Sequence, residues 1–396
     1  MSEAQAARGE THRVLLVPGF FGFGRLGDIA YFTGVREELE RSFGRLGLDA
    51  EIIELTTLPT ASIRERAARV VEALAEVATR GGPIHIIGHS TGGLDARLAL
   101  APTASLPTRV VFERPELVES LVTVSCPHFG SPAATFFSGA FGRRLLRVGT
   151  RYLIWLLARG LLLRLALAFG YFIVKIRDPF GKRRGTFAEF KEKLFDDFSD
   201  ERRRALTEFF EHVGRDQSLL FQLTPAGCDL LNACTADPKV RYGSVVTRSP
   251  EVTWRSLLRS TWDLYTQIMH PLYGFLRFVV SRGESRVIPP PVPAQEAKLL
   301  EAYRELPSAR DNDGLVPTNS QVWGELIHAT VADHLDVVGK FGSLGGTAWA
   351  GDWIPSYSDF DAARFEALWD DVARFIAAGR AKELGVGTER TARDLA

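Results

Sequence analysis

A serine set between two glycines is the residue of this sequence best placed to act as a nucleophile. Ser90 lies in the run Gly-His-Ser-Thr-Gly at 88–92, which follows the apolar segment 84–87 and precedes the helix-like segment 94–100. A sharp turn from strand to helix holds such a serine exposed, and the N–H groups that begin the helix point at the reacting centre. We therefore expect Ser90 to be the nucleophile of an acyl-transfer reaction.

The acid and the base that activate a serine nucleophile are expected later in the chain, in the order Ser, Asp, His. Asp313 lies in the run Asp-Asn-Asp-Gly-Leu-Val at 311–316, and His334 lies in Asp-His-Leu-Asp at 333–336. The residues between them leave room for a strand that would deliver His334 to the carboxyl edge of a parallel sheet, where catalytic groups gather. Asp311, in the same loop as Asp313, is the alternative acid.

The remaining histidines and acids fit these roles less well. His85 lies inside a strand, and His89 is adjacent to the nucleophile and cannot turn back to serve as its base. His128 follows a strand and could line the pocket. Asp333 and Asp336, close to the base in sequence, are badly placed to bond its far nitrogen.

An acyl-transfer site also needs N–H donors that stabilise the oxyanion. One donor is expected from Thr91, the residue after the nucleophile. The other is expected from the glycine-rich loop 18–24, which follows a short apolar strand at 14–17. Within that loop we expect Phe20 to be the donor, with Phe21 as the alternative.

Short apolar segments alternate with helical segments through the first third of the chain. Strands are expected at 14–17, 51–55, 84–87 and 121–125, and helices at 30–46 and 62–79. This alternation indicates an α/β fold with a mostly parallel central sheet flanked by helices. Later strands are expected at 240–246 and 324–331, followed by an amphipathic helix at 361–378.

A change of pattern divides the chain. Residues 12–132 and 238–380 are expected to form the two halves of one core, the second half with a helical excursion at 250–306. Residues 133–237 contain helical patterns and no convincing strand, so we expect them to form a large helical cap or lid. The polar residues 381–396 are expected to form a flexible tail.

The first part of the cap has an unusual composition. Residues 152–174 are almost wholly apolar, and basic residues surround them within 143–184. Such a segment suits a lipid-binding lid or peripheral contact with a membrane surface. Arg159 and Arg164 argue against a simple transmembrane helix, and an ordinary buried cap helix is the alternative.

The amino-acid composition indicates which binding partners and which cellular location to expect. Lys and Arg together number 48 and balance 48 Asp and Glu, so we expect no overall attraction to nucleic acid. The three cysteines are too few for a disulfide framework. Residues 1–13 are polar and lack the apolar segment of a secretory signal, so we expect a cytoplasmic location, with membrane association through the cap.

Taken together, these motifs resemble those of bacterial true lipases (triacylglycerol lipases), which have the α/β-hydrolase fold. The resemblance is carried chiefly by Gly-His-Ser-x-Gly-Gly at 88–93, Asn-Asp-Gly-Leu-Val at 312–316 and Asp-His-Leu-Asp at 333–336. It implies an acyl-enzyme mechanism on lipid esters under a helical lid. In that mechanism Ser90 would be the nucleophile, Asp313 the acid and His334 the base.

The chain departs from the family at two functional positions. Pro18-Gly19 replaces the usual His-Gly after the first strand, which keeps the backbone donor and removes a side chain near the oxyanion hole. Many members bind a structural Ca²⁺ through an aspartate two residues after the catalytic histidine and a glutamine four residues further on. Asp336 matches the aspartate, but Lys340 occupies the glutamine position. We therefore expect no metal and no cofactor, with the lysine ammonium replacing the charge of the ion; a structural Ca²⁺ is the alternative.

The sequence therefore predicts a serine hydrolase that cleaves carboxylic esters of lipids, a lipase or an esterase. An acyltransferase that uses the same three residues is the alternative within enzymes. A lipid-binding protein that keeps the fold without catalysis is the alternative outside them.

Overall fold

The computed structural model describes residues 10–20, 25–26, 29–140, 142, 144, 218–233, 239–254, 256, 264–283, 288–342 and 352–383. The apolar segment 152–174 lies outside these residues. So does the expected membrane-contacting segment 143–184, apart from position 144. Of the expected cap, the structure describes only the two ends.

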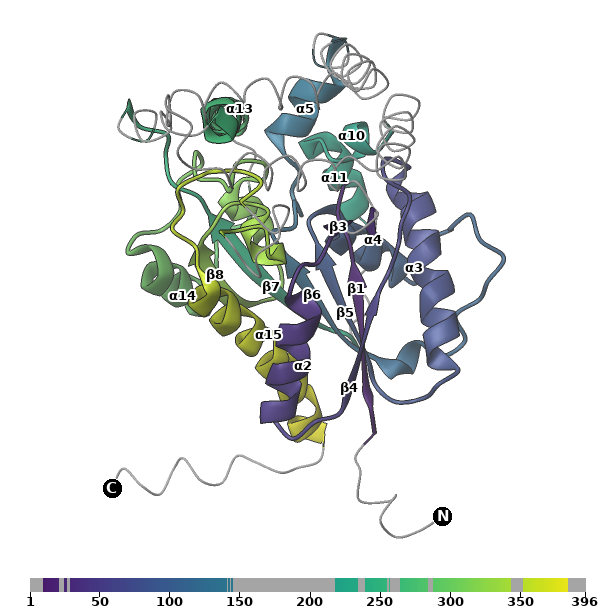
Figure 1. The fold of residues 1–396 in the computed structure, drawn as a ribbon. Coiled ribbons are helices and arrows are strands. Elements are labelled where there is room, and N and C mark those ends of the chain that lie inside the picture. Colours follow the sequence, from purple (N-terminus) through teal and green to yellow (C-terminus); the bar gives the residue numbers. More distant parts are fainter. Residues whose placement is uncertain are drawn as a thin grey trace, which may run out of the picture.

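Six strands in the described part of the chain form one sheet in the order β4-β1-β5-β6-β7-β8 (Figure 1). All five neighbouring pairs are parallel. The strands are β1 (His12–Val17), β4 (Ala50–Glu54), β5 (Ile84–His89), β6 (Val118–Val124), β7 (Arg241–Arg248) and β8 (Glu325–Val331). Because the order reverses at β1, the loops after β1 and β5 open at a switch point of the kind where α/β sheets place their sites.

Helices cover both faces of the sheet, and alternation along β1 explains why. Val14 and Leu16 point into a core formed with α2 (Val35–Arg45) and α15 (Ala362–Glu383). Leu15 and Val17 point the other way, into a core formed with α3 (Ile63–Ala78). A strand whose neighbouring side chains all meet apolar partners is buried on both faces, as parallel strands are.

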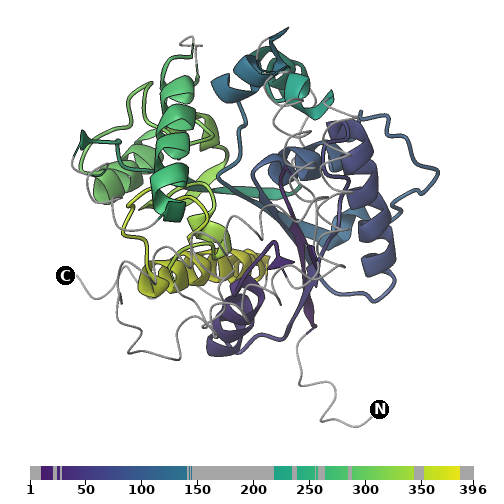
Figure 2. The ribbon, with the colours of Figure 1, turned by 45° about the horizontal axis from the view of Figure 1, so that its top comes forward.

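The remaining elements complete the two layers and the edge of the sheet. They are β2 (Arg25–Leu26), β3 (Ile29–Ala30), α4 (Thr91–Ala99), α5 (Pro132–Ser138), α10 (Ser218–Gln222), α11 (Pro225–Asn232), α13 (Leu264–Ser281), α14 (Pro293–Tyr303) and short 3₁₀ helices at Pro115–Leu117, Thr318–Gln321 and Asp336–Val338. Helices α5, α10, α11 and α13 lie beyond the carboxyl ends of the strands (Figures 1 and 2).

Most expected elements are present, and two boundaries differ notably. The helix expected at 30–46 begins only at Val35, because Gly34 adopts a left-handed conformation with φ 73° and β3 pairs with β2 before it. Helix α14 occupies part of the expected excursion and begins at Pro293, the last residue of the proline-rich stretch 288–293. Helix α15 runs to Glu383, so the first residues of the expected tail are helical.

Among the described residues, none of the helices combines the length and the apolar character that crossing a bilayer requires.

Candidate active site

Ser90 occupies a strained turn between β5 and α4. Its backbone has φ 55° and ψ −127°, and its N–H donates to the carbonyl of Val124 at 2.8 Å. Such a conformation costs about 1–3 kcal/mol and persists only where the surroundings impose it. Here the surroundings are tight: a Cβ on Gly92 would lie 2.3 Å from the carbonyl oxygen of Val17, and one on Gly88 would lie 2.5 Å from a backbone nitrogen of α4. The two glycines of the motif are therefore required by close backbone approach.

His334 reaches Ser90 from the loop that follows β8. Its Nε2 lies 2.9 Å from the hydroxyl oxygen of Ser90, and its Nδ1 lies 2.8 Å from Oδ2 of Asp313. A carboxylate at Nδ1 requires an N–H there, which leaves Nε2 as the acceptor for the serine proton. The imidazole is therefore held in the tautomer that a general base needs.

Asp313 is fully buried and fixed by its own turn. Its Oδ1 accepts hydrogen bonds from the N–H groups of Leu315 at 3.0 Å and Val316 at 2.8 Å. Gly314 allows the turn, since its φ of +99° is unfavourable for other residues. Oδ2 of Asp313 hydrogen-bonds to His334 and to the hydroxyl of Thr247, which lies at 3.0 Å. The Asn-Asp-Gly-Leu-Val motif is thus a turn that aims one carboxylate oxygen at the histidine.

The alternative acid, Asp311, has a different role. Its carboxylate accepts hydrogen bonds from the backbone N–H and the hydroxyl of Ser308 at 2.7 and 2.8 Å, so it shapes the preceding turn. Two further residues, Thr247 and Gln321, hold Asp313 without having been expected from the sequence. The side-chain amide of Gln321 lies 3.3 Å from Asp313 Oδ2. No motif marks these two residues, because they come from β7 and a 3₁₀ turn and meet Asp313 only in the folded chain.

The loop after β1 is oriented by a buried arginine on α3. The Nη2 of Arg66 lies 2.9 Å from the carbonyl oxygens of both Pro18 and Gly19. In a trans peptide the N–H points opposite to the C=O, so the N–H of Phe20 points away from Arg66. Thr91, the other expected donor, is the first residue of α4, where N–H groups lack partners within the helix.

The same arginine is paired with Asp95 on α4. Both side chains are fully buried, and Nη2 of Arg66 lies 2.7 Å from Oδ2 of Asp95. Burial raises the pKa of Asp95 to about 6, against the opposing effect of Arg66. The ion pair joins the loop after β1 to the helix that carries Thr91. The alternative oxyanion donor, Phe21, lies outside the described residues.

Two other histidines lie away from Ser90, His334 and Asp313. His128 is buried between Thr123 Oγ1, 3.0 Å from its Nε2, and the guanidinium of Arg97, 3.1 Å from its Nδ1. Its ring stacks on Trp323. The bonds of both ring nitrogens hold His128 in the core near the end of β6. His85 lies inside β5, as expected, and is fully buried.

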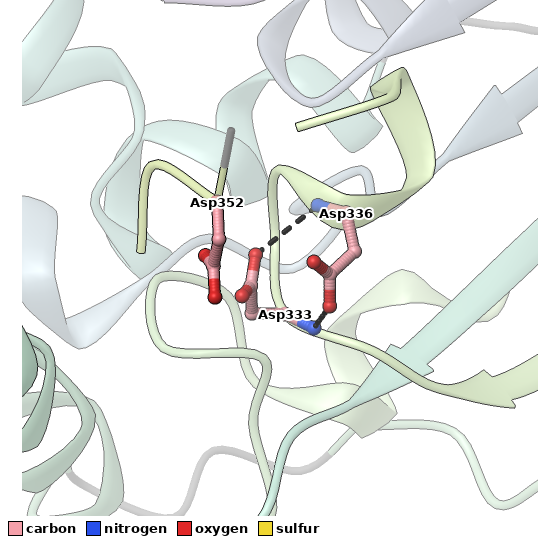
Figure 3. A group of neighbouring side chains, drawn as sticks. All are labelled: Asp333, Asp336 and Asp352. Atoms are coloured by element: carbon pink, nitrogen blue, oxygen red, sulfur yellow. Dashed lines mark hydrogen bonds between the residues drawn. The ribbon is translucent and has the colours of Figure 1, made fainter. Parts of the chain in front are cut away.

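Three carboxylates lie together, two of them on the loop that carries His334: Asp333, Asp336 and Asp352 (Figure 3). One ligand oxygen from each lies within 4.8 Å of the others. Burial raises the pKa of Asp336 to about 7 and that of Asp352 to about 6. Burial, together with the two neighbouring charges, raises the pKa of Asp333 well above its ordinary value. Such crowding of negative charge is relieved by protons or by a cation.

The carboxylate cluster, Asp333 with Asp336 and Asp352, fits a hard cation such as Ca²⁺. All its donors are oxygens, the ligand type that calcium prefers, and Oδ1 of Asp352 is buried without a hydrogen-bond partner. The ammonium of Lys340 hydrogen-bonds instead to the carbonyl of Ala30 and the hydroxyl of Thr33. Among the described residues it forms no ion pair with the cluster, so the expected replacement of the ion by lysine is not seen.

No family model matches the chain. It is 31% identical over 127 residues to a triacylglycerol lipase of Vibrio cholerae, and 29% identical over 131 residues to a triacylglycerol lipase of Pseudomonas fragi. Each match covers 32% of this chain but only 36% and 39% of the respective lipase. The sequence likeness therefore spans little more than a third of either curated relative.

Solved structures extend the likeness of fold over nearly the whole chain. Staphylococcus hyicus lipase covers 95% of this chain, and 97% of that lipase is matched, with a TM-score of 0.50 and 16% identity. A metagenomic carboxyl esterase covers 93% of this chain, with 76% of the esterase matched, at the same TM-score and identity. The chain therefore has the α/β-hydrolase fold, and the curated relatives support its resemblance to bacterial triacylglycerol lipases.

Proposed function

We propose that this protein is a carboxylic ester hydrolase that acts on lipid esters through Ser90, His334 and Asp313. The observation that carries the proposal is the unbroken line of hydrogen bonds, 2.9 Å from serine to histidine and 2.8 Å from histidine to aspartate, at a strained turn on this fold. The relatives named triacylglycerol lipase favour an ester as the substrate.

The geometry accounts for each step of the reaction. The Ser90 oxygen attacks the ester carbonyl while His334 Nε2 takes the serine proton, and Asp313 stabilises the imidazolium that forms. The N–H groups of Phe20 and Thr91 are the proposed donors to the oxyanion of the tetrahedral intermediate. His334 then gives its proton to the leaving alcohol. Water, activated by the same histidine, releases the acyl group and restores Ser90.

Apolar side chains on the helices beyond the carboxyl ends of the strands favour a substrate with an acyl chain. Phe137 on α5 and Phe275 on α13 both lie against Phe136, with ring centroids 5.1 and 5.7 Å from it. Phe275 is 40% exposed and Phe278 is 53% exposed. These helices lie beyond the carboxyl ends of the strands, where Ser90 is held (Figure 2). An acyl chain would bury apolar surface that water now covers.

Hydrolysis of p-nitrophenyl esters with two- to sixteen-carbon acyl chains tests the proposal. We expect kcat/KM to rise about tenfold or more from the two- to the eight-carbon ester, because each buried CH₂ contributes about 0.8 kcal/mol. Activity confined to the shortest ester would contradict a lipid substrate. Product analysis with added alcohol separates the alternatives: free acid supports hydrolysis, and a new ester as main product would indicate an acyltransferase.

We also propose that Ca²⁺, when bound, is held by the carboxylate cluster. The ion would neutralise the cluster and tie the loop that carries His334 to the segment around Asp352, without taking part in the reaction. Calcium at millimolar concentration is expected to raise Tm by about 2 °C or more over the protein in EDTA. Magnesium, which requires tighter octahedral geometry, should raise it less.

The matched variants for this test are Asp352→Asn and Asp359→Asn. Asp352→Asn should abolish the calcium-dependent rise in Tm, because it removes one of the three carboxylates. Asp359 lies on the same segment but outside the cluster, so Asp359→Asn should keep the rise. Equal shifts in both variants, or no shift in the wild type, would overturn the metal assignment.

A further inference from the structure

A line of buried hydrogen bonds joins the loop after β1 to the backbone of the catalytic histidine. The N–H of Gly19 lies 2.9 Å from the hydroxyl of Tyr31, and that hydroxyl lies 2.7 Å from Nδ1 of His89. Nε2 of His89 lies 2.9 Å from the backbone carbonyl of His334. We call Tyr31 and His89 the bridge. Both are buried, His89 completely.

The two ends of this line fix the direction of every hydrogen bond within it. A backbone N–H can only donate, so the Tyr31 oxygen accepts from Gly19. A backbone carbonyl can only accept, so Nε2 of His89 carries the proton and donates to His334. Nδ1 is then the acceptor for the Tyr31 hydroxyl. His89 is therefore a neutral imidazole, and burial together with His334 lowers its pKa well below the ordinary value.

The bridge completes the restraint of the catalytic histidine. The backbone N–H of His334 donates to the carbonyl of Asp313 at 3.0 Å, so that end of the residue is held by the acid's own loop. Its carbonyl is held by His89, the residue directly before the nucleophile. A backbone shift that moved His334 away from Ser90 would have to stretch one of these bonds.

The other end of the bridge restrains the loop after β1, which carries Phe20, the proposed oxyanion donor. Gly19 packs directly beneath the nucleophile: a Cβ at this position would lie 2.7 Å from both Cβ of Ser90 and the Tyr31 hydroxyl. Its N–H is held by Tyr31 and its carbonyl by Arg66. With both peptide planes of Gly19 fixed, the direction of the next N–H, that of Phe20, is fixed as well.

We propose that Tyr31 and His89 are positioning residues that hold the base and the oxyanion donor in register on either side of Ser90. The proposal rests on the proposed function, since it assigns these residues a role in the reaction of that triad. Small displacements matter at such a site, because a misplacement of about 1 Å can cost about a hundredfold in rate.

Single variants at each position test the bridge. Tyr31→Phe removes one hydroxyl and keeps the ring. His89→Gln keeps an N–H donor for the His334 carbonyl, whereas His89→Leu removes both contacts. We expect Tyr31→Phe and His89→Leu to lower kcat by about 10- to 100-fold with KM changed by less than about threefold, and His89→Gln to recover part of the loss.

The double variant Tyr31→Phe/His89→Leu distinguishes a bridge from two separate structural contributions. Because both changes break the same connection, the double variant should be little slower than the slower single variant. His85→Gln is the matched control. His85 lies on the same strand and is also fully buried, and it bonds to His12 and Ser120 away from the triad. Its kcat per active site should equal that of the wild type, even if its Tm is lower.

The readout is kcat per active site, with active sites counted by stoichiometric release of p-nitrophenolate from a p-nitrophenyl phosphonate. A merely structural role would lower Tm and the number of active sites but leave kcat per site unchanged, and that result would overturn the bridge. Multiplicative losses in the double variant would overturn it too. A wild-type protein that neither turns over esters nor reacts with the phosphonate would instead overturn the proposed function.

Discussion

Replacing Ser90 by alanine is expected to lower kcat for ester hydrolysis by about a millionfold, to the level left by binding and oxyanion stabilisation alone. Among the residues that the structure describes, the Ser90 hydroxyl is the one hydrogen-bond partner of Nε2 of His334, at 2.9 Å, so we expect no neighbouring side chain to take over its role. Initial rates with the best p-nitrophenyl ester measure the loss. Tm should change little, because the substitution removes one oxygen and leaves the backbone of the turn in place.

Ser120→Ala provides a matched control for this substitution. Ser120 is also a buried serine 2.9 Å from a histidine nitrogen, that of His85, but the pair lies within β5 and β6 away from the site. Its removal should leave kcat within about threefold of the wild type, as expected for a variant outside the reacting groups. Comparable losses in both variants would show that stability, not the nucleophile, limits the rate.

Asp313→Asn is expected to lower kcat by about 10³- to 10⁴-fold with little change in KM. The N–H groups of Leu315 and Val316 bond to Oδ1, so the asparagine oxygen should remain there and turn its NH₂ group toward His334. An N–H donor facing Nδ1 forces the proton of the neutral ring to Nε2. In that tautomer the histidine cannot accept the proton of Ser90.

The control for this prediction is Asp311→Asn. Asp311 lies in the same loop, but its carboxylate bonds to Ser308. Steady-state kinetics of both variants on one ester should show full activity for Asp311→Asn. A large loss in Asp311→Asn with activity retained in Asp313→Asn would reverse the assignment of the acid.

Local patterns were sufficient to predict most strands and the mostly parallel sheet, but not the order of the strands. Strands such as β1 and β5 contain short apolar runs, because parallel strands are buried on both faces. The turn around Asp313 is a short-range requirement of backbone geometry, and the glycines around Ser90 allow close backbone approach at one sharp turn, so both leave compact motifs in the sequence. The order of the three expected triad residues was therefore readable before their distances were known.

Contacts made by residues far apart in the chain could not be predicted in this way. His89 was assigned no role because it is adjacent to the nucleophile, yet its ring meets Tyr31 and the backbone of His334. Asp352 belongs to the carboxylate cluster although no motif connects it to Asp336. Each contact depends on the packing of loops at the carboxyl edge, where spacing along the sequence carries no information.

The most direct measurement is the site of covalent labelling by diethyl p-nitrophenyl phosphate. Attack by the serine oxygen forms an O–P bond, expels p-nitrophenolate and leaves a diethylphosphoryl group that peptide mass spectrometry locates. We predict one label per chain, on the peptide that contains Ser90, and none in Ser90→Ala. A label on another residue, or ester hydrolysis that continues in a protein that cannot be labelled, would contradict the assignment of Ser90 as the nucleophile.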